Sequence, residues 1–127
     1  MRLKEISYID VNPINGYGPG FFRIGGKVYH GALLLSGAGT SAWAGFEDAA
    51  QILSLAGQID VVLVGTGVEI SYIPANFRKV LEEAGIGIEV MRTSSACRTY
   101  NILLSEGRRI AAALLPVDKA NQAADQN

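Results

Sequence analysis

Residues 59–89, IDVVLVGTGVEISYIPANFRKVLEEAGIGIE, decide the fold class of this chain. The apolar run at 61–64 is bounded by glycines, which is typical of a strand buried on both faces. Pro74 is a favourable first helical residue, because the N–H that it lacks would be unpaired there in any case. Gly85 is suited to end the helix. A further strand at 88–91 completes a βαβ unit, whose two strands we expect to be parallel. The apolar stripe of this helix has the spacing i, i+3, i+4 and i+7: Phe77, Val80, Leu81 and Ala84.

Upstream of this unit, the sequence predicts a hairpin followed by a helix. Residues 21–24 and 27–30 are β-rich runs joined by two glycines, which can adopt the positive φ of a tight turn. The second run continues into 32–35 and loses its alternation, so we expect it to enter the buried middle of the sheet. Small residues at 37–41 indicate a flexible connection, because they match no phosphate-binding motif. Apolar residues recur at helical spacing across 46–56 and predict a helix.

Downstream, the sequence predicts one more helix and one more strand. Thr93 or Ser94 is a natural N-cap, and Gly107 ends the apolar stripe that follows. Residues 110–115 form the last apolar run. The order of elements predicts an α/β fold: a three-layer single domain with about three helices. Its mixed β-sheet should be parallel at the centre and antiparallel at the N-terminal hairpin.

The domain is expected to span residues 1–117. Turn dipeptides such as Asn15-Gly16 predict an irregular N-terminal segment to about residue 19. Residues 118–127 carry little that could be buried, and we expect them to form a disordered tail.

Composition excludes several classes of protein. The chain has 127 residues, of which 49% are hydrophobic and 18% charged, so it is a core-forming domain and not a disordered chain. Its net charge of −1 argues against nucleic acid as a partner. A single cysteine excludes an internal disulfide and a multi-cysteine metal site. The apolar runs are too short to cross a membrane, and no secretory signal is visible, so we expect a cytoplasmic protein.

Four segments carry a resemblance to a known family: NGYGPGFFRIGGKVYHGALLL, DVVLVGTG, IPANFRKVLEEAGIGIEVM and TSSACRTYNILLSEGRRIAAALLP. Over about residues 16–116 the chain resembles a small uncharacterised-domain family of bacteria and archaea. Its eukaryotic relatives include an assembly factor of mitochondrial respiratory complex I and an adipogenesis-associated protein. The resemblance implies a single-domain, three-layer α/β fold and supplies no catalytic residue. The assembly-factor relative suggests that the family works through protein–protein contacts.

One place in the predicted fold has the features of a small-anion site. Free N–H groups at a helix N-terminus, hydroxyls and guanidiniums converge there, close to the carboxyl ends of the parallel strands. The alternative is an ordinary capped helix whose arginines are solvated or paired with Glu89. The candidate ligand-binding residues are Arg92, Thr93, Ser94, Ser95 and Arg98, together with Thr66 and Gly67.

Cys97 and His30 are the weak catalytic candidates. Cys97 falls in the first turn of the predicted helix, where the helix dipole favours a thiolate, but it also lies close to the apolar stripe, where cysteine is simply a small hydrophobe. His30 could act as a base, although a hydrogen-bonded structural histidine is the commoner outcome. No residue spacing indicates a metal site or a cofactor.

Two functional hypotheses follow from these observations. The first is a non-enzymatic binding or assembly module that uses a protein surface, with a small anion in the crevice formed by residues 92–98. The alternative is a small enzyme that uses Cys97, with Arg92 or Arg98 holding an anionic substrate. Exposure of the Cys97 sulfur to a pocket would separate the two hypotheses.

Overall fold

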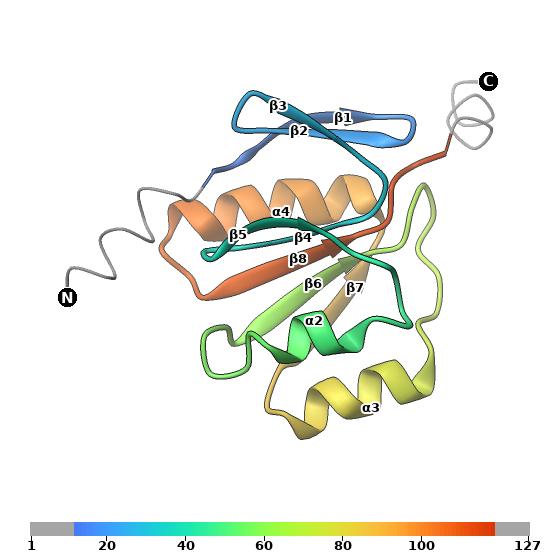
Figure 1. Cartoon of the computed structure of the whole chain (residues 1–127), viewed down its shortest axis with the longest axis vertical. Helices are drawn as coiled ribbons and strands as arrows, with labels where there is room; N and C mark the ends of the chain where they lie inside the picture. The colour runs from blue at the N-terminus through green and yellow to red at the C-terminus, as the bar shows by residue number, and fades with distance from the viewer. Residues whose placement is uncertain (1–11, 119–127) are drawn as a thin grey trace.

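A five-stranded mixed sheet lies at the centre of the computed structural model, which describes residues 12–118 (Figure 1). The strand order is β5-β4-β8-β6-β7. β6 is parallel to β8 and β7, and β4 is antiparallel to β5 and β8. The strands are β4 (Leu33–Ser36), β5 (Gly39–Ala42), β6 (Val61–Gly65), β7 (Gly87–Met91) and β8 (Ile110–Leu114).

Both faces of this sheet are covered. The short helix α2 (Ala49–Leu53) and the helix α3 (Ala75–Glu83) pack on one face, and α4 (Thr93–Ser105) packs on the other (Figure 1). A second, three-stranded antiparallel sheet lies on the outer side of α4. It consists of β1 (Ile14–Gly18), β2 (Phe21–Ile24) and β3 (Lys27–His30). The helix α4 therefore packs between two sheets, with Thr93, Ala96, Cys97 and Tyr100 buried.

The predicted fold class is confirmed, and the predicted βαβ unit is present. β6 and β7 are parallel, with Leu63 opposite Glu89. Val62, Leu63 and Val64 are each at most 1% exposed, as expected for a strand covered on both faces. α3 begins at Ala75 with Pro74 as its N-cap, one residue later than predicted. Gly85 follows its C-terminal end with φ of +83°, the left-handed conformation that ends a helix.

The N-terminal hairpin forms where it was predicted, but its sheet is separate from the central one. Gly31, with φ of +85°, directs the chain out of β3 and towards β4 in the central sheet. The prediction of an irregular segment up to residue 19 is wrong at residues 14–18, because Ile14–Gly18 is the strand β1, and its residues 1–11 lie outside the described part of the chain. The turn residues noted in the sequence are accommodated by an irregular register between Ile14 and Gly16. The tail predicted at 118–127 lies, beyond Asp118, outside the described residues.

The side chain of Asn101 fixes the small sheet to α4. Its Oδ1 accepts a hydrogen bond from the Ile14 N–H, and its Nδ2 donates one to the Ile14 carbonyl, both at 2.8 Å. This amide uses both backbone polar groups of one β1 residue, as a neighbouring strand would. The contact joins residues 87 positions apart, so local sequence patterns could not predict it.

Two further sequence predictions are wrong. Residues 37–41 are not a flexible connection, because Gly39–Ala42 is the strand β5 and forms a tight hairpin with β4. The helix predicted over 46–56 is restricted to Ala49–Leu53. Phe46 instead lies in an aromatic cluster with Trp43 and Phe77, and the Trp43 indole donates a hydrogen bond to the Asp48 carbonyl. These contacts hold the preceding residues in a turn although their spacing suits a helix.

Replacing Leu63 with Ala should lower the free energy of unfolding by about 2–5 kcal/mol, because Leu63 is 1% exposed between two neighbouring strands. Ile102→Ala is the control: Ile102 is 51% exposed on α4, so its truncation should change stability by less than about 0.5 kcal/mol. Urea unfolding measures both values. Equal effects of the two substitutions would contradict the central position of β6.

Candidate functional site

The first helical residue of α4, Thr93, joins three segments at the carboxyl ends of the parallel strands. Its hydroxyl accepts a hydrogen bond from the Gly67 N–H at 2.8 Å and donates one to the Leu115 carbonyl at 2.7 Å. Its own N–H donates to the Gly67 carbonyl at 2.9 Å. Thr93 is fully buried. The prediction that Thr93 or Ser94 caps this helix is wrong: the N-cap is Arg92, whose side chain makes no capping bond.

Close packing at Gly65 brings α4 into this position. A Cβ atom at Gly65 would lie 2.9 Å from Thr93 Oγ1 and 3.0 Å from Thr93 Cα, so that a larger residue would push α4 away from the strand. The glycine that ends β6 therefore allows the first turn of α4 to pack directly against the strand. The sequence indicated only that this glycine bounds the apolar run.

A second threonine holds the loop between β6 and α3, which we call the 66–74 loop. The Thr66 hydroxyl donates a hydrogen bond to the Glu69 carbonyl at 2.8 Å and accepts one from the Ser71 N–H at 3.1 Å. Between and beyond these anchors the loop exposes two large side chains: Ile70 is 62% exposed and Tyr72 is 100% exposed. The sequence patterns did not single out Ile70 and Tyr72. Several apolar residues in the link between a strand and a helix are nevertheless a signal of an exposed apolar loop.

The residues predicted to bind a small anion are only partly available for a ligand. Thr66, Gly67 and Thr93 come together as expected, but their hydroxyl and N–H groups bond to one another or to nearby backbone. Arg92 and Arg98 are exposed. The ion pairs within residues 12–118 are Arg78–Glu82 and Arg109–Asp60, so the predicted alternative of an arginine paired with Glu89 does not occur there. Anion binding by Arg92, Ser94, Ser95 and Arg98 stays a prediction.

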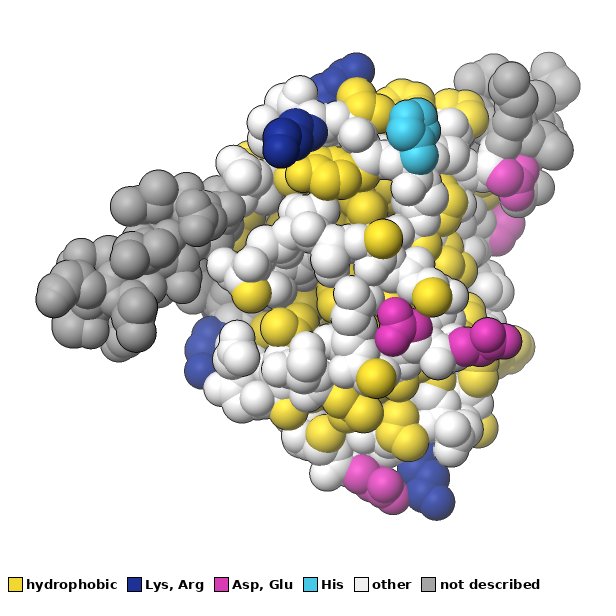
Figure 2. All heavy atoms as spheres, viewed as in Figure 1, with side chains coloured by type: hydrophobic (Ala, Val, Ile, Leu, Met, Phe, Trp, Pro, Cys, Tyr) yellow, Lys and Arg dark blue, Asp and Glu magenta, His cyan; other side chains and the backbone are white. Residues whose placement is uncertain are grey.

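The structure places Cys97 and His30 in different environments. Cys97 is 5% exposed in the core between α4 and the two sheets. Burial raises the pKa of its thiol to about 12, although the nearby Arg98 guanidinium acts in the opposite direction. His30 is exposed on β3, and Figure 2 shows it in cyan on the surface. Within the described residues no hydrogen bond links the two, and no group of metal-ligating side chains is present.

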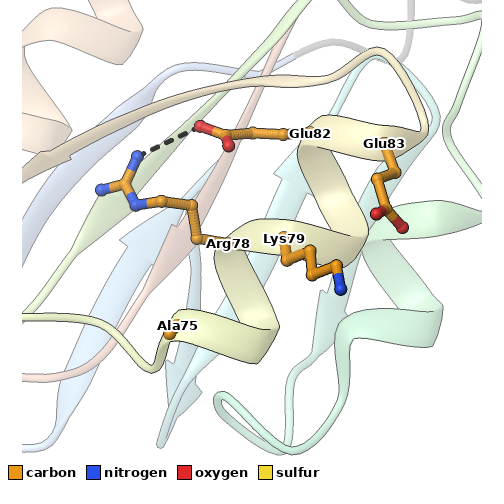
Figure 3. Close-up of a pocket in the computed structure, with 5 residues that line it drawn as sticks. All are labelled: Ala75, Arg78, Lys79, Glu82 and Glu83. Atoms are coloured by element: carbon orange, nitrogen blue, oxygen red, sulfur yellow. Dashed lines mark hydrogen bonds and ion pairs between the residues drawn. The ribbon is translucent and has the colours of Figure 1, made fainter.

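Two depressions of the surface offer little convergent chemistry. The larger is lined by Ala75, Arg78, Lys79, Glu82 and Glu83, all from α3, and in Figure 3 these side chains spread away from a single helix. The Arg78–Glu82 ion pair there, at 3.4 Å, joins two exposed side chains and is an ordinary i,i+4 contact. The smaller hollow, of about 210 Å³, lies between the β4–β5 hairpin and α2. Its lining is uncharged, and it includes Ser36, Ser41 and Gln51.

No helix in the described part of the chain is long and apolar enough to cross a bilayer. Figure 2 shows acidic and basic side chains scattered over the face in view, without a patch of one sign.

Replacing Thr93 with Val should destabilise the domain by about 1–3 kcal/mol, because the isosteric side chain leaves the partly buried Gly67 N–H and Leu115 carbonyl without their partner. Thr93→Ser keeps the hydroxyl and should cost only about 1 kcal/mol for the lost methyl group. Thermal or urea unfolding compares the two variants. A Ser variant as unstable as the Val variant would show that packing, and not hydrogen bonding, maintains this joint.

Native Cys97 should react slowly with a thiol reagent from about pH 7 to about pH 10, because its thiol is buried and its pKa is raised to about 12. In urea the same thiol should react faster as the pH rises through its ordinary pKa of 9.0. The chain has one cysteine, so the labelling rate reports this site alone. Rapid labelling of the folded protein at neutral pH would favour the alternative in which Cys97 is catalytic.

Comparison with known proteins identifies the relatives of this chain. It is 48% identical over 120 residues to an uncharacterized protein from Rhodobacter capsulatus, covering 94% of this chain and 97% of the relative. It is 34% identical over 110 residues to NADH dehydrogenase (ubiquinone) 1 alpha subcomplex assembly factor 3 of Danio rerio. That alignment covers 81% of this chain but only 63% of the assembly factor.

A solved structure described as an outer membrane protein from Bartonella henselae superposes with a TM-score of 0.79 at 36% identity. It covers 85% of this chain and 97% of that one. The expected kinship with complex I assembly factors is confirmed, whereas kinship with an adipogenesis-associated protein stays a prediction. A family model described as "Protein of unknown function (DUF498/DUF598)" matches residues 14–115, and the chain therefore belongs to this family.

Proposed function

We propose that this domain is a non-enzymatic assembly module that binds a protein partner through the 66–74 loop. The observation that carries the proposal is the full exposure of Tyr72 beside Ile70, which is 62% exposed. Tyrosine is a frequent anchor of protein interfaces, because its ring supplies a large apolar area and its hydroxyl a hydrogen bond. Exposed large apolar side chains that lie close together in sequence, as these two do, are candidates for contact with a partner.

The way the loop is held supports this role. Three hydrogen bonds of 2.8–3.1 Å fix its first half: Thr66 to Glu69, Ser71 to Thr66, and Gly67 to Thr93. Ile73, the next apolar residue, packs against the core on the α3 side. A loop that is fixed at both ends loses less conformational entropy on binding than a free segment would.

The chemistry of the remaining candidates weighs against the enzyme alternative. A catalytic cysteine needs a thiolate and access to its substrate, whereas Cys97 is buried and has a raised pKa. The hydroxyl of Thr93 is committed to two internal hydrogen bonds. The assembly-factor relative, 34% identical over 110 residues, lends further support to a protein-binding role. A cytoplasmic location for this module stays a prediction.

A photo-crosslinking amino acid at position 72 should capture a discrete protein partner in native cells, because this side chain projects fully into solvent. Position 102 is the matched control, since Ile102 is also an exposed apolar residue, at 51%, but lies on α4. Mass spectrometry of the adducts identifies the partner, and an Ile70→Ser variant should weaken its capture about tenfold or more.

The absence of a discrete adduct at position 72, or equal capture at positions 72 and 102, would contradict the proposal that the 66–74 loop is the docking surface. Loss of a turnover activity in a stably folded Cys97→Ser variant would instead favour the enzyme.

A further inference from the structure

Within the described part of the chain, β7 is an edge strand with unused backbone hydrogen-bonding groups. Among the described residues only β6 pairs with it. The Gly87 N–H donates to the Asp60 carbonyl, and the Met91 carbonyl accepts from the Thr66 N–H. In a parallel ladder alternate residues bond to the same neighbour, so positions 87, 89 and 91 face β6. The N–H and C=O groups of Ile88 and Val90 therefore point to the open edge.

The other sheet edges of the described chain are shorter or better protected. The edge of β1 is occupied at Ile14 by the Asn101 amide, which bonds to both of its backbone groups. β3 has only four residues and begins with the exposed Lys27, a side chain that discourages strand addition. β5 also has four residues. β7 has five residues and neither proline nor lysine, so it is the least protected edge.

The one charge on β7 limits what can pair with it. Glu89 is exposed and lies at the middle of the strand. If a second copy of this chain added β7 to β7 about a two-fold axis at the strand centre, two Glu89 carboxylates would lie directly opposite each other. Like charges in that position destabilise a strand pair, whereas a lysine or arginine there would stabilise it.

We infer that β7 accepts an extended strand of a protein partner that carries a lysine or arginine opposite Glu89. This inference rests on the proposed function, in which the domain binds a protein. The two surfaces adjoin, because the 66–74 loop begins with Thr66, whose N–H binds Met91 at the end of β7 (Figure 1). Backbone hydrogen bonds from Ile88 and Val90 would supply affinity, and Glu89 would supply selectivity.

The test uses two short blocked peptides of alternating threonine and valine, one with a central lysine and one with a central glutamate. Hydrogen exchange of the Ile88 and Val90 amides is followed by NMR as each peptide is added to the whole protein. The lysine peptide should slow exchange about tenfold at a concentration about ten times its Kd. The glutamate peptide should bind about tenfold more weakly, and Glu89→Lys should reverse the preference.

Val90→Pro is the matched backbone variant. It removes an N–H that points away from β6 and so leaves the β6–β7 ladder intact, a position at which edge strands tolerate proline. Strand addition should be lost while the rest of the NMR spectrum is unchanged. If this variant does not fold, the Glu89→Lys variant still tests the inference, through the expected reversal of preference between the two peptides.

Unchanged exchange at Ile88 and Val90 with both peptides would overturn the inference, as would equal binding of the two peptides. Protection of these amides that rises with protein concentration alone would show that a second copy occupies the edge, which also contradicts it. If the Ile88 and Val90 amides are not protected but position 72 still crosslinks to a partner, strand addition to β7 is contradicted and the proposed function is not.

Discussion

The buried hydroxyl of Thr93 is the interaction on which the end of the fold that carries the 66–74 loop depends. It is fully buried, and it is both a hydrogen-bond donor, to Leu115, and an acceptor, from Gly67. A buried hydroxyl without partners would cost free energy, so the segments that meet here must keep their mutual positions. The start of α4, the end of β8 and the start of the 66–74 loop are thereby fixed together.

The hydrogen bonds of Thr93 lie at a position where many α/β proteins bind a ligand. The carboxyl ends of parallel strands usually form a ligand crevice, because loops diverge there and helix N-termini offer free N–H groups. Here the Thr93 N–H binds the Gly67 carbonyl, and Gly65 lets the helix pack against the strand without a gap. The hydroxyls of Thr66 and Thr93 instead hold a loop that presents Ile70 and Tyr72 outwards.

The small sheet has a complementary structural role. It covers the outer side of α4, which explains why Cys97 and Tyr100 on that helix are at most 5% exposed. The Asn101 amide attaches β1 to the helix and occupies backbone groups that would otherwise lie open. Within residues 12–118 the sheet edges are therefore unequal, and β7 of the central sheet is an edge of five residues without proline or lysine.

The sequence by itself determined the βαβ unit, the hairpin at residues 21–30 and the α/β class, because these depend on local periodicity, glycine turns and short chain separations. Local patterns could not show that Phe46 packs with Trp43 and Phe77, in the turn that precedes the start of α2 at Ala49. The candidate site was predicted only in its location. Whether the Thr93 hydroxyl caps a helix or joins distant segments depends on Gly67 and Leu115, which are 26 and 22 residues away. Only the tertiary structure decided that it joins them, because a hydroxyl bonds to whichever groups packing brings within reach.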